Sequence, residues 1–560
     1  MMKMLTGMVR GLRIALLALV WCGFVPVHAS EVVRSAIASA HPLATAAGES
    51  VLAQGGNAFD AAVAVAAALA VVEPYSSGLG GGGFFLLHRA ADNHQVMIDA
   101  RETAPSGVLP GHFFSADGRP IEGATTRGGT AAAIPGTPAA LVHLARRYGK
   151  LPLAVTLQPA IRLAGAGFAV DRRYVRIAQL RVAMLRESAG TQVFLDNGAV
   201  PAPGYRLRQP DLAATLERIA REGAAGFYQG AVAQGLVAAV NAAGGVWQME
   251  DLAAYRVIER EPVRFRYRDA IITSASLPSA GGIALEQALG MLEHFDIGGL
   301  AEPDRAHLVA EVLRRAFRDR ALLGDPQRVV LSALGITKKD YLKQQVNSIS
   351  RDRVSRLPLP VEGGRKGSSN TTHFSIVDRD GNRVAATLTI NLLFGSGVVG
   401  RGTGVLLNNE MDDFTLRSDV ANSFRLRGGA ANAIAPGMRP LSSMTPTFVE
   451  DGKGVLVLGA PGGSRIISQV LLAILEYLRQ SDVDVERLVA MPRYHHQFWP
   501  DRIEIEPEGF SEEWRAALQA KGHQFRVVNR KWGNMQAVYL PRSGPARAAS
   551  DPRGNDVAWY

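Results

Sequence analysis

The stretch SSNTTHFSIVDRDGNRVAATLTIN, residues 368–391, is the feature that most constrains the fold of this chain of 560 residues. Apolar and polar residues alternate on both sides of Asp380-Gly381, which predicts two strands joined by a tight turn. The alternation continues downstream, whereas the spacing of apolar residues between 39 and 340 is mainly helical. This change of period predicts sheets covered by helices.

The length of the turn decides which residues the hairpin brings together. A two- or four-residue loop centred on the Asp-Gly pair places Thr372 opposite Thr389 and Thr371 opposite Ile390. A three-residue loop places Thr371 opposite Thr389 instead. Either register brings a second hydroxyl close to the first residue of the strand. Cross-strand threonine pairs are common in sheets, so the hairpin alone favours a structural role.

Most of the expected helices lie upstream of this hairpin. The run NAFDAAVAVAAALAVVEP, residues 57–74, begins with a capping Asn, stops before Pro74 and is apolar nearly all round, which predicts a core helix. The preceding segment, 44–56, forms a helical hairpin with it. Further helices are expected at 136–148, 153–166, 209–222, 230–243, 281–295 and 303–322, and strands at 83–90 and 96–100.

Downstream of the hairpin, the predicted elements are mainly strands. A second strand–turn–strand unit is expected at 445–459, followed by a helix at 464–479. The tail predicts strands at RIEIE, QFRVV and MQAVYL and a helix at SEEWRAALQAKG. Between 340 and 370 the chain is polar and irregular, which predicts an exposed loop dividing two interlocked segments and also suits proteolytic nicking.

The first 29 residues have the layout of a cleaved secretory signal. Three basic residues precede an apolar run that is too short for a comfortable membrane span, and small residues follow it. An uncleaved anchor is the alternative. The only cysteine, Cys22, lies in this segment, so the mature chain has no disulfide, thiol nucleophile or thiolate metal ligand. The net charge of +10 is scattered, which indicates a solvated surface rather than a nucleic-acid site.

Thr371 would be a nucleophile if it became a chain terminus. A threonine hydroxyl needs an adjacent base, and the α-amino group of an N-terminal threonine can serve as one. Such an amine titrates at about 7.7 to 8.0, so much of it is neutral near neutral pH. A cut before Thr371 would therefore give the chain a nucleophile and a base in one residue.

Motifs along the mature chain carry a family resemblance. Downstream they are NTTHFSIVD, TLTIN, FGSGVV, GVLLNNEMDDF, RPLSSMTPT, GAPGGSRII, PRYHHQFWPD and ASDPRG, and upstream HPLAT, GGNAFDAAVA, EPYSSGLGGGGFF and DARETAP. In order and spacing these motifs resemble the gamma-glutamyltransferase (gamma-glutamyltranspeptidase) family of N-terminal-nucleophile hydrolases. The resemblance implies an α+β fold, a four-layer αββα sandwich that both segments build jointly.

The resemblance also implies an exported, self-cleaving proenzyme, periplasmic or secreted. Its signal would span 1–29, its large subunit 30–370 and its small subunit 371–560, and the two cleavage products would stay together as a heterodimer. Thr371 would attack the Asn370 carbonyl to cut the chain. It would then take the γ-glutamyl group from glutathione or other γ-glutamyl amides and pass it to water, an amino acid or a dipeptide. No cofactor, metal or nucleic acid is implied.

Further site residues follow from the resemblance. Glutamyl donors end in a zwitterion, and Arg101 with Ser442 and Ser443 would hold the α-carboxylate, a task that suits the fork of donors of arginine. Three residues would hold the α-ammonium: Asn391, Glu410 and Asp413. The backbone N–H groups of Gly462 and Gly463 would stabilise the oxyanion, and Thr389 would bind near the amine of the nucleophile.

Two other motifs favour structural roles. GLGGGG, residues 78–83, lacks the Lys of a phosphate loop and predicts close backbone packing near the site. His495 and His496 are adjacent on a predicted strand and point to opposite faces, with no ligand spacing beside them.

One departure from the family concerns the loop after Asp413. It carries Phe424 where bacterial members often have a tyrosine over the glutamyl pocket, so the balance of hydrolysis and transfer stays open. Glu410 occupies a position that varies between Gln and Glu. Two alternatives also stay open: a cephalosporin (glutaryl) acylase-like amidase, which Asp413 disfavours, and a secreted binding protein that keeps the fold but never matures.

Overall fold

The computed structural model describes residues 35–358 and 371–554, so the predicted signal and Asn370 lie outside the described residues. Its centre is a pair of six-stranded antiparallel sheets. In sheet order, the first contains β1 (Ala36–Ser39), β9 (Thr372–Val377), β10 (Arg383–Thr389), β2 (Gly82–Arg89), β3 (His94–Ala100) and β6 (Ile258–Arg260). The second contains β17 (Arg547–Ser550), β16 (Gln536–Pro541), β12 (Gly454–Gly459), β11 (Thr447–Glu450), β8 (Ala270–Ser274) and β7 (Val263–Tyr267).

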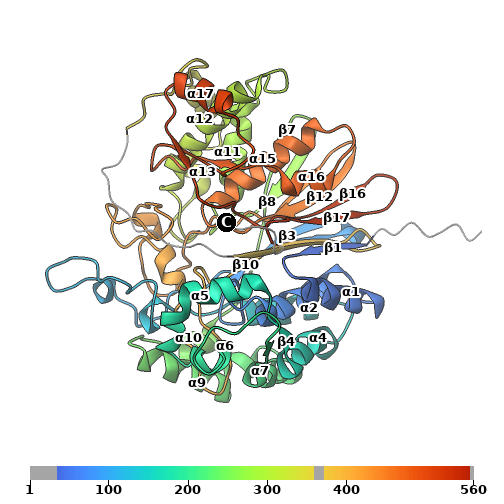
Figure 1. Cartoon of the computed structure of the whole chain (residues 1–560), viewed down its shortest axis with the longest axis vertical. Helices are drawn as coiled ribbons and strands as arrows, with labels where there is room; N and C mark the ends of the chain where they lie inside the picture. Colours follow the sequence, from blue (N-terminus) through green and yellow to red (C-terminus); the bar gives the residue numbers. More distant parts are fainter. Residues whose placement is uncertain (1–34, 359–370, 555–560) are drawn as a thin grey trace, which may run out of the picture. The chain divides into compact units, whose positions relative to one another are not determined.

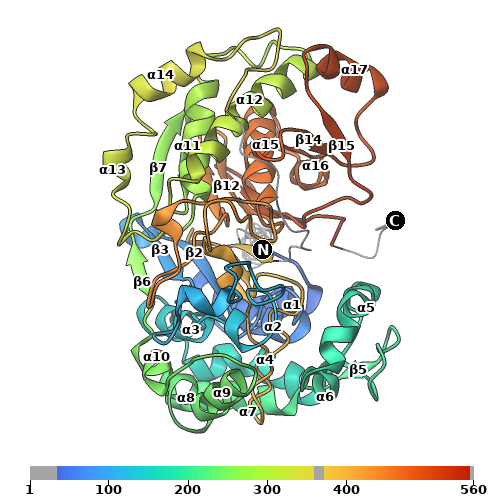
Figure 2. The same ribbon diagram turned by 90° about the vertical axis from the view of Figure 1, so that its left-hand side faces the viewer.

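Helices cover the outer face of each sheet (Figure 1). The first sheet carries α1 (Pro42–Ala53), α2 (Ala58–Val72) and α3 (Thr137–Arg147), backed by α4 (Leu153–Ala166), α5 (Arg172–Arg186), α7 (Pro210–Glu222) and α9 (Gly230–Ala242). The second carries α11 (Gly281–Leu292), α15 (Arg465–Arg479) and α16 (Val485–Ala490), with α12 (Glu302–Arg320) and α17 (Glu512–Ala520) outside them. A quarter turn shows the same two helical layers on either side of β2 and β3 (Figure 2). The expected four-layer αββα sandwich is confirmed.

The remaining α-helices and strands of the described residues are short. They are β4 (Phe168–Ala169), β5 (Arg206–Leu207), α6 (Gly190–Phe194), α8 (Ala225–Tyr228), α10 (Met249–Ala254), α13 (Leu331–Leu334), α14 (Lys339–Asn347), β13 (Tyr494–His495), β14 (Ile503–Ile505) and β15 (Phe525–Val527). The helix α14 corrects the expectation of an irregular chain from 340 onward. It was missed because Leu342 is its only buried residue, so its apolar face is minimal.

The hairpin of β9 and β10 lies at the centre of the sandwich. All residues of both strands are buried, because α2 packs on one face and the second sheet on the other. Leu388 lies opposite Thr372, so Thr389 falls opposite Thr371, which is the register of the three-residue loop. Gly381 adopts φ +86°, and the Asp378 carboxylate accepts the N–H groups of Asp380 and Asn382. These bonds close the loop and explain why the other register is wrong.

The core helix α2 is tied to the same hairpin. All of its residues are buried, and Asn57 caps its start as predicted, while Asp60 completes a capping box that was not predicted. The other oxygen of Asp378 accepts the N–H of Ala58 at 2.8 Å, so the hairpin turn also caps the helix. Within the described ranges, no helix is both long and apolar enough to cross a bilayer.

Glycines allow the strands to meet next to the start of β9. A side chain at Gly81 would overlap the carbonyl oxygen of Thr389, and one at Gly80 would overlap that of Leu406. The GLGGGG run is therefore close backbone packing, as expected.

Candidate active site

A small cavity opens at the first residue of β9 and gathers side chains from distant segments. We call it the threonine cavity. It is lined by Arg101, Arg320, Thr371, Thr389, Asn391, Glu410, Asp413, Phe424, Leu426, Ser442, Ser443, Met444, Gly463, Ser464 and Ile466. Of the site residues expected from the sequence, only two are missing from this lining. Gly462 lines a neighbouring cavity, and Asn370 lies outside the described residues.

The two threonines of the hairpin face each other in this cavity. Their hydroxyl oxygens lie 3.3 Å apart. The N–H of Asn391 donates to Thr389 Oγ1 at 2.8 Å, which favours Thr389 as the donor toward Thr371. Asn391 adopts a left-handed backbone (φ 72°), which turns the chain so that this N–H points back at Thr389.

Thr372 lies on the opposite face of the strand. Its hydroxyl donates to Glu73 Oε2 at 2.8 Å, and Glu73 is buried below the sheet at the end of α2. Successive residues of a strand point to opposite faces, so Thr371 faces the cavity and Thr372 the helical layer. The Thr372 hydroxyl is therefore engaged below the sheet and does not reach the cavity.

A buried cluster of ions forms one wall of the threonine cavity. The Arg101 guanidinium donates to Glu410 through Nη1 and to Asp413 Oδ2 through Nη2, the latter at 2.6 Å. Its Nε donates to the Pro440 carbonyl at 3.0 Å, which fixes the plane of the fork. The cation and the acids expected at opposite ends of a substrate are thus in direct contact with each other.

Burial makes this cluster costly to charge. It raises the pKa of Glu102, next to Arg101, to about 7, and it raises the pKa values of Glu410 and Asp413 although Arg101 opposes the shift. Burial also disfavours the charge of Arg101, but Glu410 and Asp413 outweigh it and raise the pKa of Arg101. Glu102, Glu410 and Asp413 therefore gather around Arg101, and an additional cation entering the cavity would stabilise their charged forms.

Arg320, which sequence reasoning missed, supplies another positive charge. It ends α12, lines the cavity and donates from Nε to Ser443 Oγ at 3.2 Å. Burial lowers its pKa to about 10, and Asp413 partly offsets that effect. The helix was predicted, but the sequence does not indicate that its last arginine reaches the site. Charged residues are seldom buried without a partner, so an arginine in a helix that is mostly buried was the one feature of the sequence that could have pointed to the site.

The hydroxyl oxygens of both serines accept hydrogen bonds from the protein. Ser442 Oγ accepts the N–H of Met444 at 3.1 Å, and Ser443 Oγ accepts from Arg320. Because both oxygens already accept, their hydroxyl protons can point into the cavity.

The turn Gly462-Gly463 leads into α15. Both residues have left-handed φ angles, 135° and 59°, which favour glycine. Among the described residues neither N–H donates a hydrogen bond, so both can serve an oxyanion at this edge of the cavity.

Phe424 lies between the threonine cavity and its neighbour and lines both. Its carbonyl accepts from Gln497 Nε2 at 3.0 Å, and its N–H donates to Asn422 Oδ1. Asn422 in turn donates to Asp413 Oδ1 at 3.2 Å. The loop that carries Phe424 is therefore coupled to the acid cluster.

The adjacent histidines bridge structural elements. His495 binds Ser468 and Gln497 through its two ring nitrogens, at 2.7 and 2.9 Å. His496 Nε2 lies 3.2 Å from Asp501. In the described part of the chain, no three or more His, Cys, Asp or Glu side chains are grouped as a metal site would require.

Comparisons with known proteins extend these observations. The gamma-glutamyltranspeptidase family profile matches residues 44–560. The glutathione hydrolase proenzyme of Escherichia coli (strain K12) is 38% identical over 542 residues, which cover 95% of this chain and 92% of that protein. That of Pseudomonas aeruginosa is 41% identical over 518 residues, 90% of this chain and 91% of the relative. The acylase ACY 1 proenzyme of Pseudomonas sp. (strain V22) is 36% identical over 530 residues, 92% of each.

Solved structures agree with the fold. A cephalosporin acylase from Bacillus halodurans matches with a TM-score of 0.80 and 26% identity, covering 93% of this chain and 95% of that one. The gamma-glutamyltranspeptidase of Helicobacter pylori matches with a TM-score of 0.55 and 36% identity, covering 56% of this chain and 91% of that one. Given the profile match and these relatives, the chain belongs to the gamma-glutamyltranspeptidase family.

Proposed function

We propose that this chain is an exported, self-cleaving γ-glutamyltransferase and glutathione hydrolase with Thr371 as its nucleophile. The Thr371 hydroxyl attacks the Asn370 carbonyl, the acyl group moves from nitrogen to oxygen, and water hydrolyses the ester. The products are a large subunit, 30–370, and a small subunit, 371–560. The family and the names of the proenzyme relatives support this maturation.

The mature site then has a base next to its nucleophile. The α-amine of Thr371 takes the hydroxyl proton as Oγ attacks the γ-carbonyl of the donor. The oxyanion accepts from the N–H groups of Gly462 and Gly463, while Thr389 donates to the nucleophile. The amine leaves with a proton from the α-ammonium of Thr371, and the γ-glutamyl ester passes to water or to an amino acid or dipeptide.

The ion cluster is the observation that carries the donor assignment. A γ-glutamyl donor carries one carboxylate and one ammonium, so it can exchange charges with the pair of Arg101 and Asp413. Its carboxylate meets Arg101, Ser442 and Ser443. Its ammonium meets Asn391, Glu410 and Asp413. Burial raises the pKa values of the two acids among them, Glu410 and Asp413. After the exchange, Arg101, Glu410 and Asp413 each keep a partner of opposite charge.

The acylase-like alternative rests on relatives with that name and on the acylase structure. A glutaryl donor has a carboxylate but no amine. It would separate Arg101 from the acids and leave Asp413 without a cation, which costs free energy in a buried site. The geometry therefore favours the γ-glutamyl donor. The third reading, a binding protein that never matures, predicts neither cleavage nor turnover.

The test compares the wild-type chain with Thr371→Ala on denaturing gels and with γ-glutamyl and glutaryl anilides. We expect the wild type to split into two chains and to hydrolyse the γ-glutamyl anilide, and the variant to stay intact and inactive. An uncut, inactive wild type would favour the binding protein. Cleavage of both forms would indicate a host protease, and activity on the glutaryl anilide alone would favour the acylase.

A further inference from the structure

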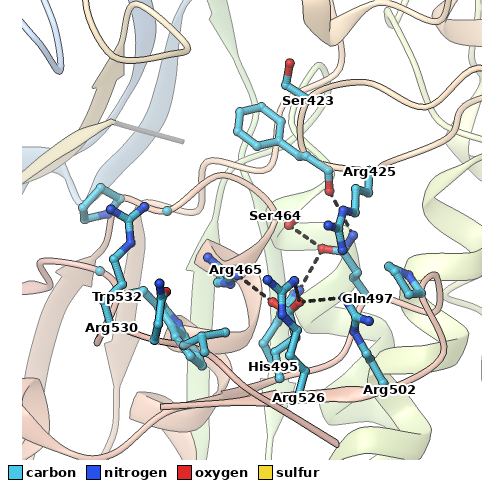
Figure 3. Close-up of a pocket in the computed structure, with 18 of the residues that line it drawn as sticks. Ser423, Arg425, Ser464, Arg465, His495, Gln497, Arg502, Arg526, Arg530 and Trp532 are labelled. Carbon is cyan, nitrogen blue, oxygen red and sulfur yellow. Dashed lines mark hydrogen bonds and ion pairs between the residues drawn. The ribbon is translucent and has the colours of Figure 1, made fainter. Parts of the chain in front are cut away.

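A second cavity adjoins the threonine cavity, and we call it the arginine cavity. It encloses about 250 Å³, and its charged lining comes from separate segments. Figure 3 shows the side chains of Arg425, Arg465 and Arg526 gathered in one region beside Gln497. Arg173, Arg502 and Arg530 also line it, and Glu504 is the only acidic residue among its described lining residues.

The positive charges of this cavity exceed its negative charge. Glu504 lies 2.5 Å from Arg465 Nη2, 3.3 Å from Arg526 Nη1 and 3.6 Å from Arg502 Nη2. A single carboxylate is thus paired with three guanidinium groups. Within the described residues, Arg425 forms no ion pair. The cluster attracts an anion more strongly than a surface of paired ions would.

Arg425 is held in this position by the loop that carries Phe424. Its backbone is left-handed (φ 61°), an unfavourable conformation for arginine, and its N–H donates to the Asn422 carbonyl at 2.9 Å. Partial burial and the nearby Arg502 and Arg526 lower the pKa of Arg425. The fold therefore keeps like charges together at a cost in free energy, and a bound anion would offset that cost.

The two cavities meet where the reacting bond would lie. Phe424 and Ser464 line both, Gly463 lines the threonine cavity and Gly462 the arginine cavity. A γ-glutamyl group bound to Arg101 and attacked by Thr371 fills the first cavity. The amine on the other side of the carbonyl is then directed past the two glycines toward the second.

We propose that the arginine cavity binds the carboxylates of the amine that leaves or attacks, and that it selects amines carrying two carboxylates, such as acidic dipeptides. The proposal rests on the proposed function of the neighbouring site. In the transfer step, the acceptor nitrogen attacks the γ-glutamyl ester and loses a proton to the α-amine of Thr371. The C–O bond then breaks, and Thr371 Oγ takes that proton from the α-ammonium and is released as the hydroxyl.

The test uses transfer from γ-glutamyl anilide to glycinamide, glycylglycine and glycylglutamate, which carry zero, one and two carboxylates. We expect the acceptor kcat/KM of the mature wild type to rise with each carboxylate, by about 10-fold over the series at low salt. Raising the salt concentration should reduce that preference. In the double variant Arg425→Gln, Arg526→Gln, the preference for glycylglutamate over glycinamide should fall about 10-fold.

Arg218→Gln is the matched control, because this arginine is exposed on α7 in the opposite helical layer. It should leave the preference unchanged, and gels and thermal unfolding establish that each variant is cleaved and folded. A wild type that transfers equally well to all three acceptors would overturn this proposal alone, as would a double variant that loses all three transfers equally. A wild type that does not use the anilide would overturn the proposed function and this proposal with it.

Discussion

The threonine cavity and the arginine cavity share Phe424 and Ser464 but differ in how their charges are balanced. In the first, Arg101 contacts Glu410 and Asp413 directly. In the second, several arginines share one carboxylate. A balanced cluster is suited to exchanging its ion pairs for those of a zwitterion, and an unbalanced one to attracting an anion. Changes in the first cavity should therefore affect every reaction of a donor, and changes in the second only certain acceptors.

The largest effect is expected from Arg101→Gln, which removes the cation that contacts Glu410 and Asp413 in the first cavity. The three acids would then face one another without it, and a donor carboxylate would lose its guanidinium partner. We expect kcat/KM for the γ-glutamyl anilide to fall by about 100- to 1,000-fold, with about a tenth of the loss recovered in Arg101→Lys. Thermal unfolding checks that the protein is folded. A fall of less than tenfold would place the donor carboxylate elsewhere.

A smaller effect, on donor choice, is expected from Asp413→Asn. The amide keeps the size of the side chain but removes a charge that would pair with the donor ammonium. The kcat/KM for the γ-glutamyl anilide should fall by about 100-fold, while the low activity on the glutaryl anilide stays level or rises. The measured quantity is the ratio of the two, with Asp412→Asn as the neighbouring control. An unchanged ratio would contradict the role of Asp413.

The third prediction concerns the pH dependence of stability. The pKa of the buried Glu102 is about 7 in the folded chain, above its ordinary value of 4.5. Between these two pH values the folded state keeps a proton that the unfolded state has lost, so the free energy of unfolding falls as pH rises. The fall can reach about 3 kcal/mol, and Glu102→Gln should remove it.

Urea unfolding at pH 4.5, 6 and 7.5 measures this effect. The Thr371→Ala background should keep the chain in one piece, so that a single unfolding transition can be followed. Glu217→Gln, which changes an exposed carboxylate on α7, should leave the profile as it is. Parallel profiles for Glu102→Gln and its background would show that the glutamate is charged throughout.

The smallest effect is expected where the cavities meet. Phe424→Tyr adds a hydroxyl to a ring that lines both cavities, without changing any charge. We expect kcat for anilide hydrolysis to stay within about twofold and the ratio of transfer to hydrolysis to change by about two- to threefold. Product analysis with glycylglycine measures the ratio. A tenfold loss of donor binding would instead mean that the ring contacts the glutamyl group.

Much of the fold could be predicted because local signals agreed with it. The helix α4 has the predicted bounds, and α2 begins after its predicted cap. The hairpin register depends on a local detail of the turn, the two N–H groups that the Asp378 carboxylate accepts, and the spacing of apolar residues does not reveal it. The strands β6, β7 and β8 were missed. In β7 apolar residues alternate with exposed arginines, which is a strand pattern, but its five residues are too few to stand out between the predicted helices on either side.

The site was less predictable than the fold, because its contacts join distant segments. Family motifs indicated the residues of the threonine cavity, but not that Arg101 would pair with Glu410 across more than three hundred positions. Nothing local links Arg425 in its loop with Arg502 and Arg526 in the tail. Such clusters form when loops pack against the folded sandwich. The spacing of residues along the chain does not reveal these contacts.

The interleaving of the two sheets has a consequence for assembly. Each sheet contains strands from before and after residue 370, and β9 is hydrogen-bonded to β1 from the start of the chain. The downstream segment alone would leave one edge of both β9 and β10 without its partner strand, and the upstream segment alone would do the same to β2. Folding of the whole chain therefore has to come before any cut at Thr371. After a cut, the interleaved strands would hold the two fragments together. The peptide link between them would be needed for folding but not for keeping the folded structure.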